Sequence, residues 1–423
     1  MKRLAIHDGF LRPGEQEDLF RDFEQSRGPA MIGKKRLSIF SVQTQTCGDG
    51  RTNDPHVFAK TGLGENIGSN KSRLLAVAVM FVTICCLSSG SLLAKGGDGS
   101  KDNDDDRGAK GGFCSQTADL LFHACGHEVQ DDFLVAYAKC MNVSDQEKRA
   151  QCLADAKAAS REGGQFCREQ WTGRRDTCKV LGENPYDPDL NPANFDDPKN
   201  PTNPNPYYPL KVGNRWEYSG GNEFNTIEVL NEIKLIDGVA CIVVRDQVFK
   251  GGELAENTDD WFVPAKDGNV WYFGEEVKDF ESFDGDDPRR PELVSIDGSF
   301  KAGRDGDKPG VIFLASPTSG DVYLEEFSLG NAEDATEVLS TTYKFGSNSE
   351  LDQFVPQQLA QRFCSSSDCV VTKNYSLLEP GIFARKYYAR GIGFFLEVTP
   401  DSGEVLQLTN CNFDSRCESL PAP

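Results

Sequence analysis

The sequence predicts an α + β protein with its two classes in separate domains. A disulfide-stapled antiparallel helical hairpin precedes an antiparallel β domain, a meander that forms a barrel or a sandwich. Two observations predict this class. Six cysteines between residues 114 and 178 have mirror-symmetric spacing, and from about residue 207 short apolar runs alternate with turn residues. Because no helical pattern alternates with those runs, a parallel α/β sheet is not expected.

The six cysteines are separated by steps of 11, 15, 12, 15 and 11 residues. Eleven residues of helix span about 16 Å, whereas a disulfide needs Cα atoms within about 7 Å. Neighbouring cysteines of one helix therefore cannot pair, but two antiparallel helices can bring outer, middle and inner pairs together. Zinc is the rival interpretation, and the absence of closely spaced cysteine pairs disfavours it. The spacing predicts three nested disulfides: Cys114–Cys178, Cys125–Cys167 and Cys140–Cys152.

The hairpin is expected over residues 113–182. Ser144 followed by Glu147 reads as a capping box at the start of the second helix, which is expected to end near Gly182. His123 and His127, with Glu128 adjacent, have the spacing of metal ligands on one helix face. We favour the interpretation that they are ordinary, partly exposed helix residues.

An export signal is predicted before the hairpin, at residues 71–94. Basic residues precede an apolar stretch that ends in small residues, as in a signal peptide, and an uncleaved stretch is long enough to anchor the chain in a bilayer. Residues 1–70 are interpreted as a disordered tail or as sequence upstream of a mis-assigned start, because cleavable signals stand at the N-terminus. The chain is expected in the periplasm, at the cell surface or outside the cell.

The charge of the exported part excludes some partners. Residues 1–94 hold 12 Lys or Arg and 9 Asp or Glu, so the remainder holds 33 and 57 and has a net charge of −24. Nucleic acid is therefore not expected as a partner, and contact with a membrane is expected only through residues 74–94. Residues 95–112 are rich in Gly and Asp and are interpreted as a linker.

A connector rich in Pro and Asn, residues 183–209, is expected to be extended. The β domain is predicted at 210–410, because strand-like runs are separated by turn signals such as Asp237-Gly238. A short helix is expected over 351–363. Residues 411–423 form a C-terminal tail with a local disulfide.

The remaining cysteines of the β domain leave alternatives open. The short spacings favour local disulfides Cys364–Cys369 and Cys411–Cys417, with Cys241 as a buried thiol. A bond between Cys241 and Cys369 is the competing pairing, and the sequence does not decide between them.

The β domain resembles an uncharacterised family of exported bacterial proteins. The matching segments are 205–210 (NPYYPL), 216–218 (WEY), 238–246, 267–274 (DGNVWYFG), 308–310, 378–381 (LEPG), 386–388 and the upstream 186–195. The resemblance implies export and a single all-β domain; it implies no activity and assigns no catalytic residue.

The sequence contains no clear pattern of catalytic residues. No histidine follows His127, so a Ser-His-Asp or Cys-His site within the β domain is excluded unless the hairpin supplies the base. Paired carboxylates are the residue type of glycoside hydrolases, but in so acidic a chain we expect them to face solvent. These carboxylates are Asp259, Asp260, Glu275, Glu276, Asp279 and Glu281.

No cofactor is expected, although two acidic loops have the residue type that calcium prefers. Ordinary turns are the favoured interpretation of both. The weak calcium candidates are Asp284, Asp286, Asp305 and Asp307.

The sequence favours a non-enzymatic exported protein whose β domain binds an unknown small molecule or an extracellular protein or polymer. A carboxylate-dependent extracellular hydrolase is the first alternative, and a structural component of the cell surface is the second. An apolar cavity would support ligand binding, whereas two buried carboxylates about 5–10 Å apart in an open cleft would support the hydrolase.

Overall fold

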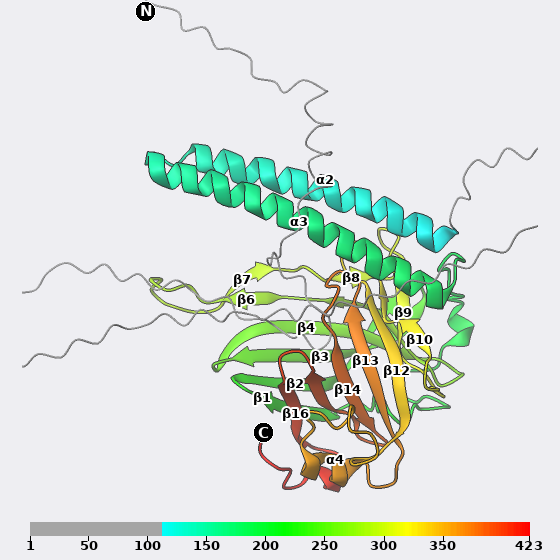
Figure 1. The fold of residues 1–423 in the computed structure, drawn as a ribbon. Coiled ribbons are helices and arrows are strands. Elements are labelled where there is room, and N and C mark those ends of the chain that lie inside the picture. Colours follow the sequence, from blue (N-terminus) through cyan, green and yellow to red (C-terminus); the bar gives the residue numbers. More distant parts are fainter. Residues whose placement is uncertain (1–111) are drawn as a thin grey trace, which may run out of the picture. The chain divides into compact units, whose positions relative to one another are not determined.

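The computed structural model describes residues 112–423 (Figure 1). The interpretations made above for residues 1–111, including the export segment, lie outside the described residues. Within 112–423, no helix combines the length and the apolar character that crossing a bilayer requires.

Two long antiparallel helices, α2 (Phe113–Met141) and α3 (Gln146–Leu181), form the hairpin. Three disulfides join them, with Cα–Cα distances of 5.7, 5.7 and 5.5 Å. Their pairing is the nested one: Cys114–Cys178, Cys125–Cys167 and Cys140–Cys152.

The start of α3 differs from the predicted capping box. Asp145, not Ser144, is the N-cap, and its carboxylate accepts a hydrogen bond from the backbone N–H of Lys148 at 2.9 Å. A carboxylate caps the positive end of a helix with charge as well as with a hydrogen bond, which favours Asp145 over the neighbouring hydroxyl.

An antiparallel sheet of sixteen strands makes up the rest of the described chain. It forms a nearly closed barrel, so the barrel is the form taken by the predicted all-β domain. Its strands are β1 (Arg215–Gly220), β2 (Glu223–Ile236), β3 (Val239–Lys250), β4 (Glu253–Pro264), β5 (Val270–Glu276), β6 (Asp279–Glu281), β7 (Glu292–Ser295), β8 (Phe300–Lys301), β9 (Lys308–Phe313), β10 (Val322–Leu324), β11 (Glu326–Phe327), β12 (Asp334–Tyr343), β13 (Cys369–Ser376), β14 (Ala384–Ala389), β15 (Gly393–Thr399) and β16 (Glu404–Cys411).

The sheet closes through one short segment. β10 pairs with β12 at one end of the strand order and β11 pairs with β9 at the other, and the single residue Glu325 joins β10 to β11. Gly310 on β9 permits this approach, since a Cβ atom there would lie 2.2 Å from the carbonyl oxygen of Glu325. Segment 322–327 therefore bridges the two edges that a meander would otherwise leave open.

A large apolar core fills part of the barrel interior, and α4 (Gln357–Phe363) contributes to it. Phe363 packs on Phe395 with ring centroids 5.1 Å apart. The predicted helix over 351–363 is real but shorter, and the physical reason is Pro356. Proline disfavours the helical conformation in the residue before it, so α4 begins only after Pro356.

The opposite face of the sheet carries a second apolar cluster, which the connector covers. Phe195 lies edge-on to Phe273, with ring centroids 5.3 Å apart. Farther along, the side-chain amide of Asn205 donates to the carbonyl oxygens of Gly268 and Leu314 at 3.0 Å each. The connector is thus extended, as expected, and it is fastened to the sheet along its length.

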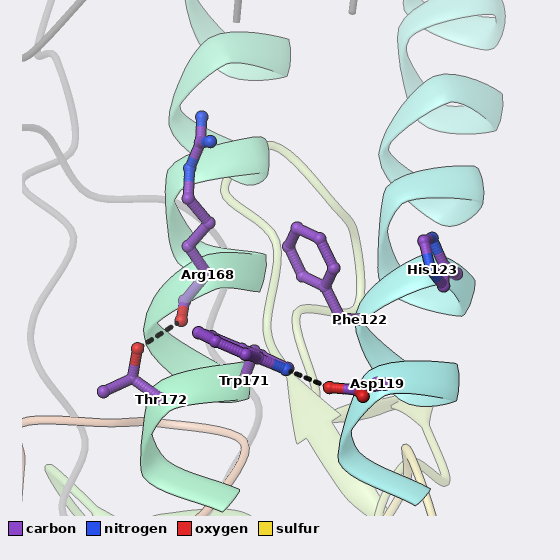
Figure 2. Close-up of a pocket in the computed structure, with 6 residues that line it drawn as sticks. All are labelled: Asp119, Phe122, His123, Arg168, Trp171 and Thr172. Atoms are coloured by element: carbon purple, nitrogen blue, oxygen red, sulfur yellow. Dashed lines mark hydrogen bonds between the residues drawn. The ribbon is translucent and has the colours of Figure 1, made fainter. Parts of the chain in front are cut away.

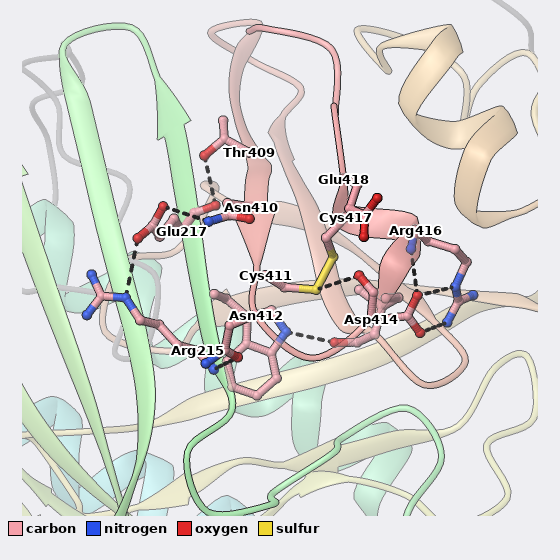
Figure 3. Close-up of a disulfide and its surroundings, with 12 residues drawn as sticks. Arg215, Glu217, Thr409, Asn410, Cys411, Asn412, Asp414, Arg416, Cys417 and Glu418 are labelled. Atoms are coloured by element: carbon pink, nitrogen blue, oxygen red, sulfur yellow. Dashed lines mark hydrogen bonds and ion pairs between the residues drawn. A yellow bond between two sulfur atoms is a disulfide. The ribbon is translucent and has the colours of Figure 1, made fainter.

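The β-domain cysteines pair locally. The structure contains Cys364–Cys369 and Cys411–Cys417, while Cys241 is buried in the second apolar cluster and is not bonded to any cysteine within residues 112–423. Figure 3 shows the loop that Cys411–Cys417 closes, with Asp414 held by Arg416 at 2.9 Å. The five disulfides of the described residues indicate an oxidising environment.

Candidate functional site

Acidic residues lie inside the barrel, on the same strand faces as the residues of the apolar core. Asp246 follows the core residue Val244 on β3, and Asp260 precedes the core residue Phe262 on β4. Residues two apart on a strand share a face. Both carboxyl groups therefore point into the barrel, where the two residues are 3% and 1% exposed.

Asp260 lies beside a second buried carboxyl and a tyrosine. Glu275 on β5 stands directly opposite Asp260 across the β4–β5 pair, and the hydroxyl of Tyr272 donates to Oδ1 of Asp260 at 2.6 Å. Burial raises the pKa of Asp260 to about 8, and burial also holds the pKa of Glu275 well above its usual range. Both carboxyls are therefore protonated over a wide range of pH in which surface carboxylates are charged.

A hydrogen-bonded network lies at the barrel closure. The carboxylate of Glu325 accepts from the hydroxyl of Thr336 and, at 2.8 Å, from the side-chain amide of Asn374. Thr372 donates in turn to the amide oxygen of Asn374 at 2.6 Å. Burial raises the pKa of Glu325 despite these bonds, so desolvation outweighs them.

A lysine lies among these acids. Lys386 on β14 is 4% exposed and pairs across the sheet with Glu397 on β15. Its positive charge lowers the pKa of Glu397, but burial is the larger effect and raises that pKa to about 7. The Lys386 charge also acts against burial at Asp246, Asp260, Glu325 and Asp334.

Several buried oxygens of this cluster lack a hydrogen-bond partner within the described part of the chain. Three of them are Oδ1 of Asp246, Oε2 of Glu397 and the amide oxygen of Asn225, and the two carboxyl oxygens of Glu275 belong to the same group. Each belongs to a residue that is less than 5% exposed. Buried acceptors are normally satisfied, so these oxygens mark the part of the interior where further donors would bind favourably.

The expectation that the paired carboxylates face solvent is wrong for three of the six. Asp260, Glu275 and Asp279 are 1%, 2% and 6% exposed. Asp260 is in phase with the core residue Phe262 on its strand. Glu275 is opposite Asp260 across the β4–β5 pair, beyond a register shift that turns it to the same face.

The other carboxylates of that set behave as expected. Asp259 forms an ion pair with Arg245 at 2.8 Å, and Glu276 and Glu281 are exposed. Sequence reasoning missed the remaining buried groups, which are Asp246, Glu325, Glu326, Asp334, Lys386 and Glu397. The sequence did contain an indication of their burial, since each of these residues lies on or beside a strand-like run.

The calcium candidates lie apart from this cluster. Asp284, Asp286 and Asp305 are exposed, and Asp284 is 3.5 Å from Arg289. Asp307 is partly buried, and burial raises the pKa of its carboxyl. Among residues 112–423, no three His, Cys, Asp or Glu side chains are grouped so as to hold a metal ion.

A hollow lies on the hairpin, between α2 and α3 (Figure 2). It has a volume of about 400 Å³ and is lined by Asp119, Phe122, His123, Arg168, Trp171 and Thr172. The indole N–H of Trp171 donates to Asp119 at 2.7 Å, and the rings of Trp171 and Phe122 have centroids 6.2 Å apart. His123 therefore lines a pocket, while no metal group forms around it in the described residues.

The barrel interior is the stronger candidate, because its polar groups are buried and some of their oxygens lack a hydrogen-bond partner among residues 112–423. We compared the chain with known protein families, curated proteins and solved structures. None of the three comparisons finds a match.

Proposed function

We propose that this is an exported, non-enzymatic protein whose β domain binds a small ligand carrying amine groups. The observation that supports the proposal is the pair of buried carboxyl oxygens, on Asp246 and Glu397, that have no hydrogen-bond partner among the described residues. Leaving a buried acceptor unsatisfied costs about 1–3 kcal/mol. A ligand that donates hydrogen bonds to both groups would recover that free energy.

The charge of the cluster specifies the chemistry of this ligand. Burial raises the pKa of Asp246, Asp260, Glu275, Glu325 and Glu397. An ammonium group placed among them would favour the ionised carboxylates and lower those pKa values again. Binding would therefore release protons, and it would strengthen as the pH rises through about 7, the pKa of Glu397.

The proposal includes export of the protein to the periplasm, the cell surface or the extracellular space. The disulfides support it, because such bonds persist in oxidising compartments. The export signal predicted at 71–94 and the resemblance to exported bacterial proteins point the same way.

Native mass spectrometry of the protein purified from its own host tests the proposal first. We expect a co-purifying small molecule that is basic. Titration calorimetry with putrescine and spermidine then measures binding and, in buffers of different ionisation enthalpy, the protons released.

Two variants locate the site. Asp246→Asn and Glu397→Gln should each weaken amine binding by about tenfold or more, because each removes a charge-assisted hydrogen bond. The matched controls are Asp284→Asn and Glu276→Gln, which change exposed carboxylates. Equal affinity in all four variants would place the ligand elsewhere and contradict the proposal.

One observation favours a second candidate function, a carboxylate-dependent hydrolase. Asp260 and Glu275 are buried and directly opposed across neighbouring strands, and a carboxyl whose pKa is about 8 suits a general acid. Assays on extracellular polysaccharides would detect turnover that Asp260→Asn abolishes. Turnover without amine binding would favour this function over the first.

A further inference from the structure

An ion pair between neighbouring strands lies at one end of the barrel. Glu223 is the first residue of β2 and Lys250 is the last residue of β3, and the two stand opposite each other across the strand pair. The ammonium nitrogen of Lys250 lies 3.8 Å from Oε2 of Glu223, and the two side chains are only 25% and 17% exposed. This end of the barrel therefore carries a largely buried carboxylate that already attracts an amine cation.

Both side chains of the pair are in phase with the barrel interior. Glu223 lies four residues before the core residue Ile227 on β2, and Lys250 lies four residues after Asp246 on β3. Because alternate residues of a strand share a face, these even separations place all four on the interior face. Ile227 and Asp246 also stand opposite each other. The ion pair and Asp246 are thus two levels of one face, separated by about 13 Å along the strands.

Asn225 occupies the level between them, where it pairs with Val248 across the two strands. Its amide nitrogen donates to Oε1 of Glu223 at 3.0 Å. Its amide oxygen, in a residue that is 1% exposed, has no hydrogen-bond partner among residues 112–423. A series of acceptors therefore runs inward from Glu223 through Asn225 to Asp246, and its two inner members each have an unpaired oxygen.

The negative charge of Glu223 is incompletely compensated. A separation of 3.8 Å is longer than a hydrogen bond, so Lys250 contributes its charge to Oε2 without donating to it. Burial raises the pKa of Glu223, although the Lys250 charge and the Asn225 hydrogen bond both lower it. The charges of Glu256 and Glu404 raise that pKa further. A second ammonium group at this end of the barrel would therefore be attracted to Glu223.

We infer that Glu223 is a specificity-determining residue, which selects ligands that carry a second amine group at a distance from the first. The inference rests on the proposed function, in which the first amine is bound by Asp246 and Glu397. The charge of Glu223 raises the pKa of both these acids, so it lies within electrostatic reach of each. The preferred ligand is a linear diamine or polyamine that spans the distance of about 13 Å between the two levels. Val248, which is 4% exposed, offers its methylene chain an apolar neighbour on the way.

Titration calorimetry of the full chain with two ligands of equal length tests the inference. Octylamine carries one amine group, and 1,8-diaminooctane carries a second one at the other end. The titrations are made at about pH 8, above the pKa of Glu397 at about 7, and in about 150 mM salt, which screens exposed charges. The wild type should bind the diamine about tenfold or more tightly than the monoamine, because its second ammonium donates a charge-assisted hydrogen bond to Glu223.

Glu223→Gln should remove this preference, so that the two dissociation constants differ by less than about twofold. Its octylamine affinity should stay close to that of the wild type, which also verifies that the variant is folded. Glu223→Asp retains the charge and should retain most of the preference. The matched control is Glu228→Gln on the same strand, because Glu228 lies on the other strand face, is 43% exposed and pairs with Arg215. The control should keep the wild-type preference.

Three results overturn the inference while leaving the proposed function in place. They are equal binding of the two ligands by the wild type, a preference that survives Glu223→Gln, and an equal loss of preference in Glu223→Gln and Glu228→Gln. A loss of both ligands in Glu223→Gln also overturns it, because Glu223 would then bind the first amine. A wild type that binds neither these ligands nor putrescine and spermidine contradicts the proposed function itself, and the inference falls with it.

Discussion

The guanidinium of Arg174 on α3 and the carboxylate of Glu333, just before β12, form a doubly hydrogen-bonded ion pair. Nε lies 2.7 Å from Oε2, and Nη2 lies 2.9 Å from Oε1. The two side chains are 6% and 4% exposed. This buried pair connects residues 159 positions apart and fixes the C-terminal half of α3 to the β domain.

Arg174→Ala should loosen the hairpin from the β domain. Removing one partner of a buried ion pair leaves the other charge uncompensated and costs about 3–5 kcal/mol. We expect faster hydrogen exchange in α3 around residue 174 and an earlier transition in urea. Arg175→Ala is the control, because Arg175 makes an exposed and longer contact of 3.9 Å with Asp119. Equal stability of the two variants would show that the pair does not hold the hairpin.

The hairpin should depend on its disulfides more than the barrel does on its own. Buried side chains on α2 are few, namely Ser115, Ala118 and Cys140. The bond Cys125–Cys167 closes a loop of 42 residues, and a loop of that size contributes about 4 kcal/mol. Cys125→Ser/Cys167→Ser should therefore lower the helical signal in circular dichroism at temperatures where the sheet persists.

The matched control for that prediction is Cys364→Ser/Cys369→Ser, which opens a loop of only five residues. Its effect on the helical signal should be small. If both double variants lost the helices together with the sheet, the two parts would unfold as one unit.

Stability should fall as the pH rises from about 4 to about 8. Burial raises the pKa of Asp260 from 3.8 to about 8 and that of Glu397 from 4.5 to about 7. Within that window the folded protein binds more protons than the unfolded chain, so each unit of pH lowers the free energy of unfolding. The midpoint of urea unfolding should be lower at pH 8 than at pH 5.

Asp260→Asn should reduce this pH dependence, because an amide does not titrate. Asp414→Asn is the control of opposite sign, since Arg416 holds the pKa of Asp414 below its usual range. Its contribution is lost only as the pH falls below about 4, so it should leave the slope between pH 5 and 8 unchanged. A slope that survives Asp260→Asn in full would assign the effect to other carboxyls.

The hairpin could be predicted from the sequence because disulfide geometry allows little choice. Once Cys114 and Cys125 cannot pair within one helix, the symmetric spacing selects nested pairing. The strands could be predicted from their alternation and turns. The run 322–327 was also predicted as a strand, but the closure through Glu325 was not, since the local pattern of a strand does not say that its two halves pair with different strands, β12 and β9.

The candidate site was missed for a different reason. Charge composition suggested that Asp260 faces solvent, whereas the phase of its strand places it beside Phe262 in the core. A carboxyl residue two positions from a core aromatic residue on the same strand is expected to face the core, and overall charge composition does not contain this information. Likewise, the cysteine spacing predicted the helix α2 but did not say that Leu120 and Leu134 lie on its exposed face.

Gly310→Ala should open the barrel at its closure. A Cβ atom at this position would lie 2.2 Å from the carbonyl oxygen of Glu325, and backbone cannot yield as a flexible side chain can. We expect a loss of about 3 kcal/mol or more and faster hydrogen exchange in β10 and β11. Gly126→Ala is the comparison, because nothing lies within 4 Å of its added methyl group and alanine favours a helix interior by about 0.5–1 kcal/mol. If Gly310→Ala unfolds like the wild type while its β10 and β11 amides stay protected, segment 322–327 does not bridge the two edges of the sheet.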